Sequence, residues 1–238
     1  MYDIYNGIIG DVMKNDSVKG IIQLVLSVLV YYILENYFFF LLGKIGIHLS
    51  GDIYNYACFG RYVLICVIIY IIYRSNLHSS KSKFTKSFIT SAIFSVGTCV
   101  LMVFVNYLLH KVVGTFHPVN GYGFTNYFND SFSISYALGL ITDIILKPFL
   151  VVVIFSLGVS NILKHTSTAS IVSGLLYGVV MMLGLNCSID QAFWIILIPS
   201  LIVMLVTYLY KSTGNIWMVY IAYALYVGCG FHVLRYFV

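Results

Sequence analysis

The chain has 238 residues, of which 61% are hydrophobic and only 9% charged, with a formal net charge of +5. Soluble domains carry about 25% charged residues, so this composition excludes an ordinary water-soluble domain. The apolar runs lack the alternating polarity, about ten residues per strand, of a transmembrane β-barrel. We therefore predict an all-α, polytopic transmembrane helical bundle that forms a single domain over residues 1–238.

The predicted membrane spans follow one another along the whole chain. A helix needs about 20 apolar residues to cross the hydrocarbon core, and about seven runs approach that length, with six or eight spans as alternatives. These runs are 20–42, 53–73, 88–109, 134–163, 167–185, 193–210 and 216–237. The run 134–163 is longer than a straight span and contains Pro148. Because proline removes a backbone donor and clashes with the preceding turn, we expect a kink or a tilted long helix there.

Basic residues predict the orientation of the bundle. The connector 74–86 carries Arg74, Lys81, Lys83 and Lys86. With seven spans, Lys14 and Lys19 before the first span, Lys164 after the fourth and Lys211 after the sixth fall on the same side. The positive-inside rule then puts this side, with the N-terminus, in the cytoplasm of a plasma membrane. We expect the 74–86 connector to attract anionic lipids, and no feature of the charge pattern indicates nucleic-acid binding.

Four charged residues lie well away from the ends of the predicted spans, where charged side chains are costly and need partners. Asp143 and Lys147 are four residues apart, so they share one face of a helix and can pair. Glu35 and Arg61 lie on antiparallel neighbouring spans and are positioned to pair across them. For Asp143 and Lys147 two interpretations stay open: a structural ion pair, or a polar site that binds a ligand or a partner. For Glu35 and Arg61 the two interpretations are a structural ion pair and part of a transport path.

Gly174 and Gly178 give the fifth span a small-x-x-x-small face, which permits close contact between helix backbones in lipid. This face is expected to pack within the bundle or against another membrane protein. The cysteines and histidines lack the spacing of a zinc site. We therefore expect neither a metal nor another cofactor.

Three segments of the C-terminal half together resemble the motifs of a known family. They are Pro148-Phe-Leu-Val-Val-Val-Ile-Phe-Ser156, Ser173-Gly-Leu-Leu-Tyr-Gly-Val-Val-Met181, and Thr213-Gly-Asn-Ile-Trp217 followed by Tyr223-Ala-Leu-Tyr-Val227. In order and spacing they resemble the CPBP family, the CAAX-protease and bacteriocin-processing proteins also called Abi proteins. The resemblance implies a CAAX-protease-like core over about 135–238.

The first motif of this family reads Pro-x-x-Glu-Glu-x-x-Phe-Arg-Gly. In the present sequence Val151 and Val152 stand at the paired glutamates. Phe155 retains the phenylalanine, and Ser156 replaces the arginine. The resemblance therefore implies that the first motif keeps its framework and loses its carboxylates.

The second and third motifs, Phe-x-x-x-His and His-x-x-x-Asn, are altered in the same way. Tyr177 and Met181 stand at the phenylalanine and the histidine of the second motif. Tyr223 and Val227 stand at the histidine and the asparagine of the third. Eight positions of this sequence thus correspond to motif positions of the family: Val151, Val152, Phe155, Ser156, Tyr177, Met181, Tyr223 and Val227. At most of them an apolar side chain stands where the family motif has a polar one.

These replacements predict a protein without catalytic residues. The resemblance implies that relatives activate water with a glutamate and stabilise the transition state with histidine and asparagine or arginine. Valine cannot exchange a proton, and Met181 and Val227 present no donor to a developing oxyanion. We therefore expect a pseudoenzyme whose former substrate groove, at the eight positions, binds a partner membrane protein or transmembrane peptide.

The partner classes that the resemblance implies are a cell-envelope enzyme held by one helix, a sensor kinase, or a bacteriocin system in which the chain acts in immunity. Two alternatives remain open. One is an active CAAX-type endopeptidase with displaced catalytic residues, for which Asp143 is the nearest carboxylate. The other is a small-solute transporter, which typically has inverted repeats or broken helices at the midplane; the sequence offers only one proline-interrupted span.

Overall fold

The computed structural model describes residues 2–82, 88–113, 134–183 and 189–227, and these residues are helical with short connectors. The elements in chain order are α1 (Tyr2–Lys44), α2 (Gly51–Ser82), α3 (Phe88–Val113), α4 (Ile134–Ile141), η2 (Thr142–Leu146), α5 (Lys147–Val151), η3 (Val152–Leu157), α6 (Gly158–Ile162), α7 (Thr166–Leu183), α8 (Ile189–Thr213) and α9 (Ile216–Leu225). No strand occurs in the described ranges, so the all-α class is confirmed.

Four helical segments are long and apolar enough to cross a membrane: Ser17–Lys44, Gly51–Ser79, Ala137–Ile162 and Thr166–Leu183. They coincide with four of the predicted spans, and the chain is therefore a membrane protein with transmembrane helices. Two shorter apolar helices, Ala92–Phe104 and Ile216–Leu225, lie within two further predicted spans. The predicted span 216–237 continues past Val227, outside the described residues.

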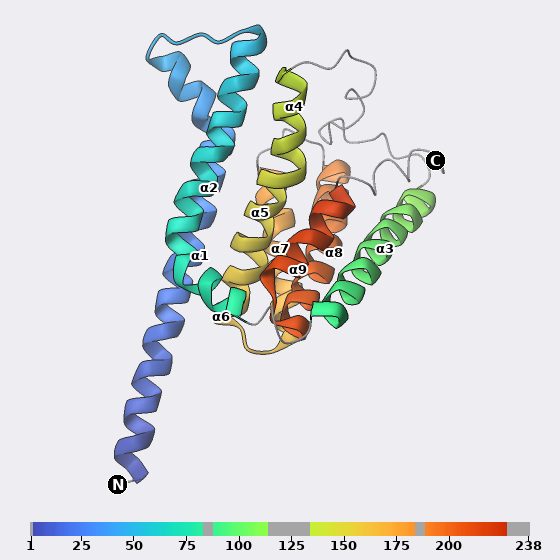
Figure 1. Cartoon of the computed structure of the whole chain (residues 1–238). Helices are drawn as coiled ribbons and strands as arrows, with labels where there is room; N and C mark the ends of the chain where they lie inside the picture. Colours follow the sequence, from blue (N-terminus) through green and yellow to red (C-terminus); the bar gives the residue numbers. More distant parts are fainter. Residues whose placement is uncertain (1, 83–87, 114–133, 184–188, 228–238) are drawn as a thin grey trace.

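The helical path from α4 to α6 forms the middle of the bundle. Figure 1 shows it between the long α1 and α2 on one side and α7, α8 and α9 on the other, with α3 at the outer edge. The N-terminal part of α1 projects beyond the other helices (Figure 1). Every segment with the sequence resemblance lies in or directly beside this central path.

Pro148 alters the central path without interrupting it. Two π-helical segments, η2 and η3, flank the single α-helical turn that contains Pro148. The N–H of Lys147 bonds to the carbonyl of Thr142, five residues back, which is the π-helical pattern. Because Pro148 has no N–H to donate, the neighbouring turns widen, and the path remains helical from Ile134 to Ile162.

The helices α7 and α8 pack closely against each other. A Cβ atom added at Gly178 would lie 2.5 Å from the carbonyl oxygen of Ile196, and one added at Gly174 would collide with the carbonyl of Ser200. Both glycines are buried. The small-residue face of α7 therefore packs inside the bundle, where the absence of side chains lets the two backbones approach.

Candidate functional site

The eight positions of the sequence resemblance lie together in the structure. Six are buried, and Met181 and Val227 are half-buried against the same hydrophobic cluster; Ser156 is enclosed among these residues. The side chains of Val152, Phe155 and Ser156 are 0% exposed. The three segments therefore meet in space, although they are separated by up to about 70 residues in sequence.

Aromatic contacts close this region from two sides. The ring of Phe155 packs edge-on against Tyr177 of α7, with centroids 5.0 Å apart, and against Tyr31 of α1, with centroids 6.3 Å apart. Edge-to-face pairs of this kind add about 0.5–1.5 kcal/mol beyond the area that they bury. Phe155 is therefore a packing residue, and it joins α1, η3 and α7.

Hydroxyl groups satisfy the few polar atoms of this core. Thr207 of α8 forms a 3.0 Å hydrogen bond with the hydroxyl of Ser156, and Ser173 of α7 donates to the carbonyl of Phe155 at 3.0 Å. All three side chains that carry these hydroxyls are fully buried. Ser156 thus makes a small polar contact between η3 and α8.

The Thr213–Trp217 segment has a local structural role. Gly214 has a φ of +65°, in the left-handed region that glycine adopts without steric cost. Asn215 then caps α9, because its side chain accepts a 3.0 Å hydrogen bond from the N–H of Trp217. The segment is a tight turn that ends α8 and starts α9, and its residue types follow from that turn.

From the sequence resemblance we expect the eight positions to line a groove open to a partner. The structure instead packs them as core, and a partner helix cannot contact Val152, Phe155 or Ser156 without displacing the helices that cover them.

An open groove lies nearby, between α2, α5 and α9, with a volume of about 400 Å³. We call it the α2–α9 groove. Its lining residues are Val63, Cys66, Val67, Tyr70, Ile145, Leu146, Phe149, Trp217 and Tyr220.

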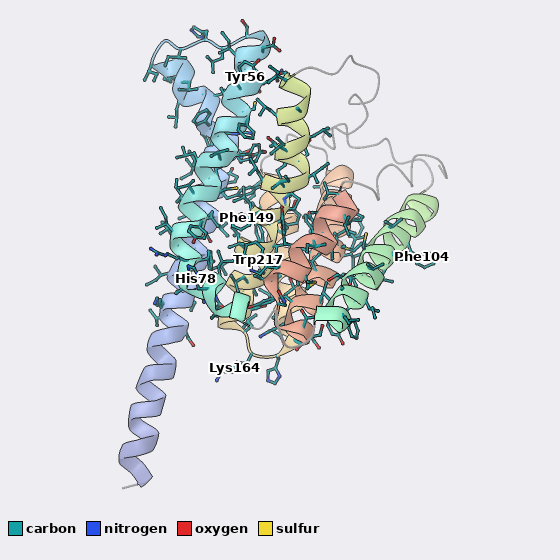
Figure 2. All side chains as sticks on the ribbon, in the orientation of Figure 1. Tyr56, His78, Phe104, Phe149, Lys164 and Trp217 are labelled. Atoms are coloured by element: carbon teal, nitrogen blue, oxygen red, sulfur yellow. The ribbon has the colours of Figure 1, made fainter. Side chains whose placement is uncertain are left out.

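The α2–α9 groove borders the segments with the sequence resemblance. Phe149 follows Pro148 in the first segment, and Trp217 ends the Thr-Gly-Asn-Ile-Trp turn; Figure 2 shows both between α2 and α9. Their rings each pack edge-on against Tyr220, with centroids 6.4 Å apart. The indole Nε1 of Trp217 is buried and has no hydrogen-bond partner among the residues that the structure describes.

Both ion pairs are present. Arg61 lies 3.3 Å from the carboxylate of Glu35 and also donates to the Glu35 backbone carbonyl at 2.8 Å. Lys147 lies 2.6 Å from the carboxylate of Asp143. Each cation is therefore neutralised inside the predicted membrane region, which is how charge is usually accommodated there.

Tyr62, which the sequence analysis did not single out, connects the two pairs. Its hydroxyl donates to the carboxylate of Glu35, and its ring centroid lies 4.7 Å from the Arg61 guanidinium and 5.1 Å from the Lys147 ammonium. The cluster of Glu35, Arg61, Tyr62, Asp143 and Lys147 spans α1, α2, η2 and α5. The position of Tyr62 next to Arg61 in the sequence indicates that it lies near the Glu35–Arg61 pair. Its contact with Lys147 on another helix cannot be predicted from the sequence.

No group of three or more potential metal ligands occurs among the described residues. Comparisons with protein-family models, curated proteins and solved structures found no match to this chain. The candidate site is therefore defined by its own geometry: a closed apolar core, a polar cluster beside it, and an open apolar groove.

Proposed function

We propose that this chain is a catalytically inactive, CAAX-protease-like membrane protein that binds a transmembrane helix of another protein. The observation that carries the proposal is the α2–α9 groove. It is open, apolar and rich in aromatic side chains, and it adjoins the segments that resemble the protease motifs. We further propose a topology of about seven spans in a bacterial plasma membrane, with the N-terminus in the cytoplasm.

The eight motif positions lack carboxylate and imidazole groups, which supports a role in binding. They carry valine, methionine, phenylalanine and tyrosine, and Ser156 is engaged by Thr207. General base catalysis needs a group that exchanges a proton within reach of the substrate. Asp143, the nearest carboxylate in the alternative of an active peptidase, is held by Lys147.

The form of the α2–α9 groove supports a helix as its occupant. On α2, Val63, Val67 and Tyr70 follow one another at helical spacing, and Ile145 and Phe149 do so on the facing wall. Such rows are ridges, and the space between two ridges accepts a ridge of a third helix. In lipid this contact is driven by packing and by hydrogen bonds between helices.

The proposal is tested by placing a photoreactive amino acid at Val67 of the full-length chain in its native membranes. Val67 is half exposed and lines the groove, whereas Leu64 is similarly exposed on the same helix and does not line it. A discrete protein adduct is expected from position 67 and not from position 64. A second substitution in the groove, Phe149→Ala, is expected to abolish this adduct. Such a loss would show that the adduct forms by binding in the groove and not by chance collision.

Two outcomes would reject this function. Equal adducts at positions 64 and 67 would mean that the groove selects no partner. Specific cleavage of a prenylated or leader-bearing peptide, lost on Asp143→Ala, would establish the alternative of an active peptidase. A bacteriocin-immunity role would be indicated if the adduct were a bacteriocin transporter or receptor.

A further inference from the structure

The face of α2 that forms one wall of the α2–α9 groove continues past the groove toward the 74–86 connector. Val63, Val67 and Tyr70 line the groove, and Arg74 follows Tyr70 by four residues on the same helix. Residues four apart on an α-helix share one face, and Arg74 is exposed. Figure 2 shows His78, four residues further along this face, near the end of α2. A guanidinium group therefore lies one turn beyond the groove, in line with its wall.

The helices around the groove offer Arg74 no counter-charge. Its side chain forms no ion pair among the residues that the structure describes. No acidic residue of α2 follows Asp52, and the sequences of α3 and α9 contain none. On the central path, Asp143 is paired with Lys147. The acidic residues of the N-terminal part of α1, a helix that does not line the groove, are Asp3, Asp11 and Asp16.

The depth of Arg74 makes its charge effective at the groove. The candidate span Gly51–Ser79 has its midpoint at residue 65, and Arg74 lies nine residues further along the helix. A rise of about 1.5 Å per residue places its Cα atom about 14 Å from that midpoint, close to the edge of a hydrocarbon core about 30 Å thick. Salt screens a charge pair at such a partly buried place less than a pair at an open surface.

We propose that the α2–α9 groove selects a transmembrane helix whose cytoplasmic flank carries Asp or Glu, and that this carboxylate pairs with Arg74. The inference rests on the proposed function and specifies its partner. Cytoplasmic flanks of transmembrane helices usually carry Lys or Arg, so in the proposed topology Arg74 repels most of them and attracts an acidic flank. Specific interfaces use such repulsion as well as attraction.

The test uses the full-length chain with the photoreactive amino acid at Val67, reconstituted in phosphatidylcholine vesicles. The probes are two synthetic peptides with the same apolar segment of about 20 residues, enough to cross the hydrocarbon core. One flank carries aspartates in the first peptide and lysines at the same places in the second. The Asp peptide is expected to give about five-fold more adduct, the factor for one ion pair near a membrane surface.

Charge variants locate the selectivity at Arg74. Arg74→Glu is expected to reverse the preference, so that the Lys peptide gives more adduct, whereas Arg74→Lys should keep the preference for the Asp peptide. The matched control is Lys19→Glu, which reverses an exposed charge on α1, outside the groove, and should change nothing. Because the result is a ratio of two adducts within one variant, a smaller amount of folded protein lowers both yields and leaves the ratio intact.

The outcomes separate this inference from the proposed function. Equal adducts from the two peptides, or a preference for the Asp peptide that survives Arg74→Glu, would overturn the inference and leave the function standing. If neither peptide reacted more at position 67 than at position 64, both would be rejected.

Native membranes supply the second measurement. The partner captured at position 67 is expected to have acidic residues at the cytoplasmic end of its span, and its adduct should be lost in Arg74→Glu and kept in Lys19→Glu. An adduct with the mass of a phospholipid would instead show that an anionic lipid occupies the groove, which would overturn the inference and the proposed function together.

Discussion

Tyr62 donates a hydrogen bond to the Oε1 atom of Glu35 while its ring lies against the Lys147 ammonium, so one side chain joins two ion pairs on different helices. Through it, the hairpin of α1 and α2 is attached to the central path beside the first π-helical segment. This attachment has measurable consequences for stability.

Tyr62→Phe keeps the ring and removes the hydroxyl. Hydrogen bonds between transmembrane helices contribute on average about 0.6 kcal/mol and at most about 1.7 kcal/mol, and a loss in the upper part of this range is expected because the acceptor is charged. Thermal unfolding in mild detergent measures this loss of stability. Tyr62→Leu should cost more, because the ring beside Arg61 and Lys147 is also lost. If the two variants were equally stable, the ring would have no part in the cluster.

Arg61→Met leaves the Glu35 carboxylate without its cation. Removing one member of a buried pair costs about 3–5 kcal/mol, and the low end is expected here because Tyr62 still donates to Glu35. The double variant Arg61→Met/Glu35→Leu should recover most of the loss, since no unpaired charge remains. Urea or thermal unfolding of the single and double variants measures the coupling free energy between Arg61 and Glu35. Additive losses would show that the two side chains do not interact.

Gly178→Ala is expected to destabilise the bundle by about 1–3 kcal/mol, the usual cost of overpacking a tight contact. The new methyl group would meet the Ile196 carbonyl, a backbone atom that cannot rotate away. Gly97→Ala on α3 is the matched control, because a Cβ atom there has no neighbour within 4 Å. The difference in unfolding temperature between the two variants measures the contact. Equal temperatures would mean that α7 and α8 do not pack this closely.

Val152→Glu would place a carboxylate at the position where the resemblance implies a glutamate. Because Val152 is 0% exposed in an apolar core, the cost of desolvation is expected to be several kcal/mol, and the variant should aggregate on gel filtration. Asn161→Glu, at an exposed position later on the same helical path, should behave like the unaltered chain. A monodisperse, stable Val152→Glu protein would instead indicate that water reaches this position, as in an open protease cleft.

Several features of the site could be predicted from the sequence because they depend on local spacing. Asp143 and Lys147 are separated by one helical turn, so any helix at that place brings them together. Glu35 and Arg61 lie at similar distances from the short connector between two consecutive helices, so a simple hairpin makes them neighbours. The grouping of the eight motif positions was instead an expectation from the resemblance, which placed them in an open groove, whereas the structure buries six of them.

The sequence by itself determined that this chain is helical and apolar enough to enter a membrane, because hydrophobicity and run length are properties of single segments. Only the tertiary structure decided which apolar surfaces are closed and which stay open. Val152 and Phe155 are covered because α1, α7 and α8 pack around η3, whereas Trp217 borders the groove between α2, α5 and α9. In lipid, apolar side chains in the core and at the surface are chemically alike, so composition cannot distinguish them, and the packing of helices distant in the chain does.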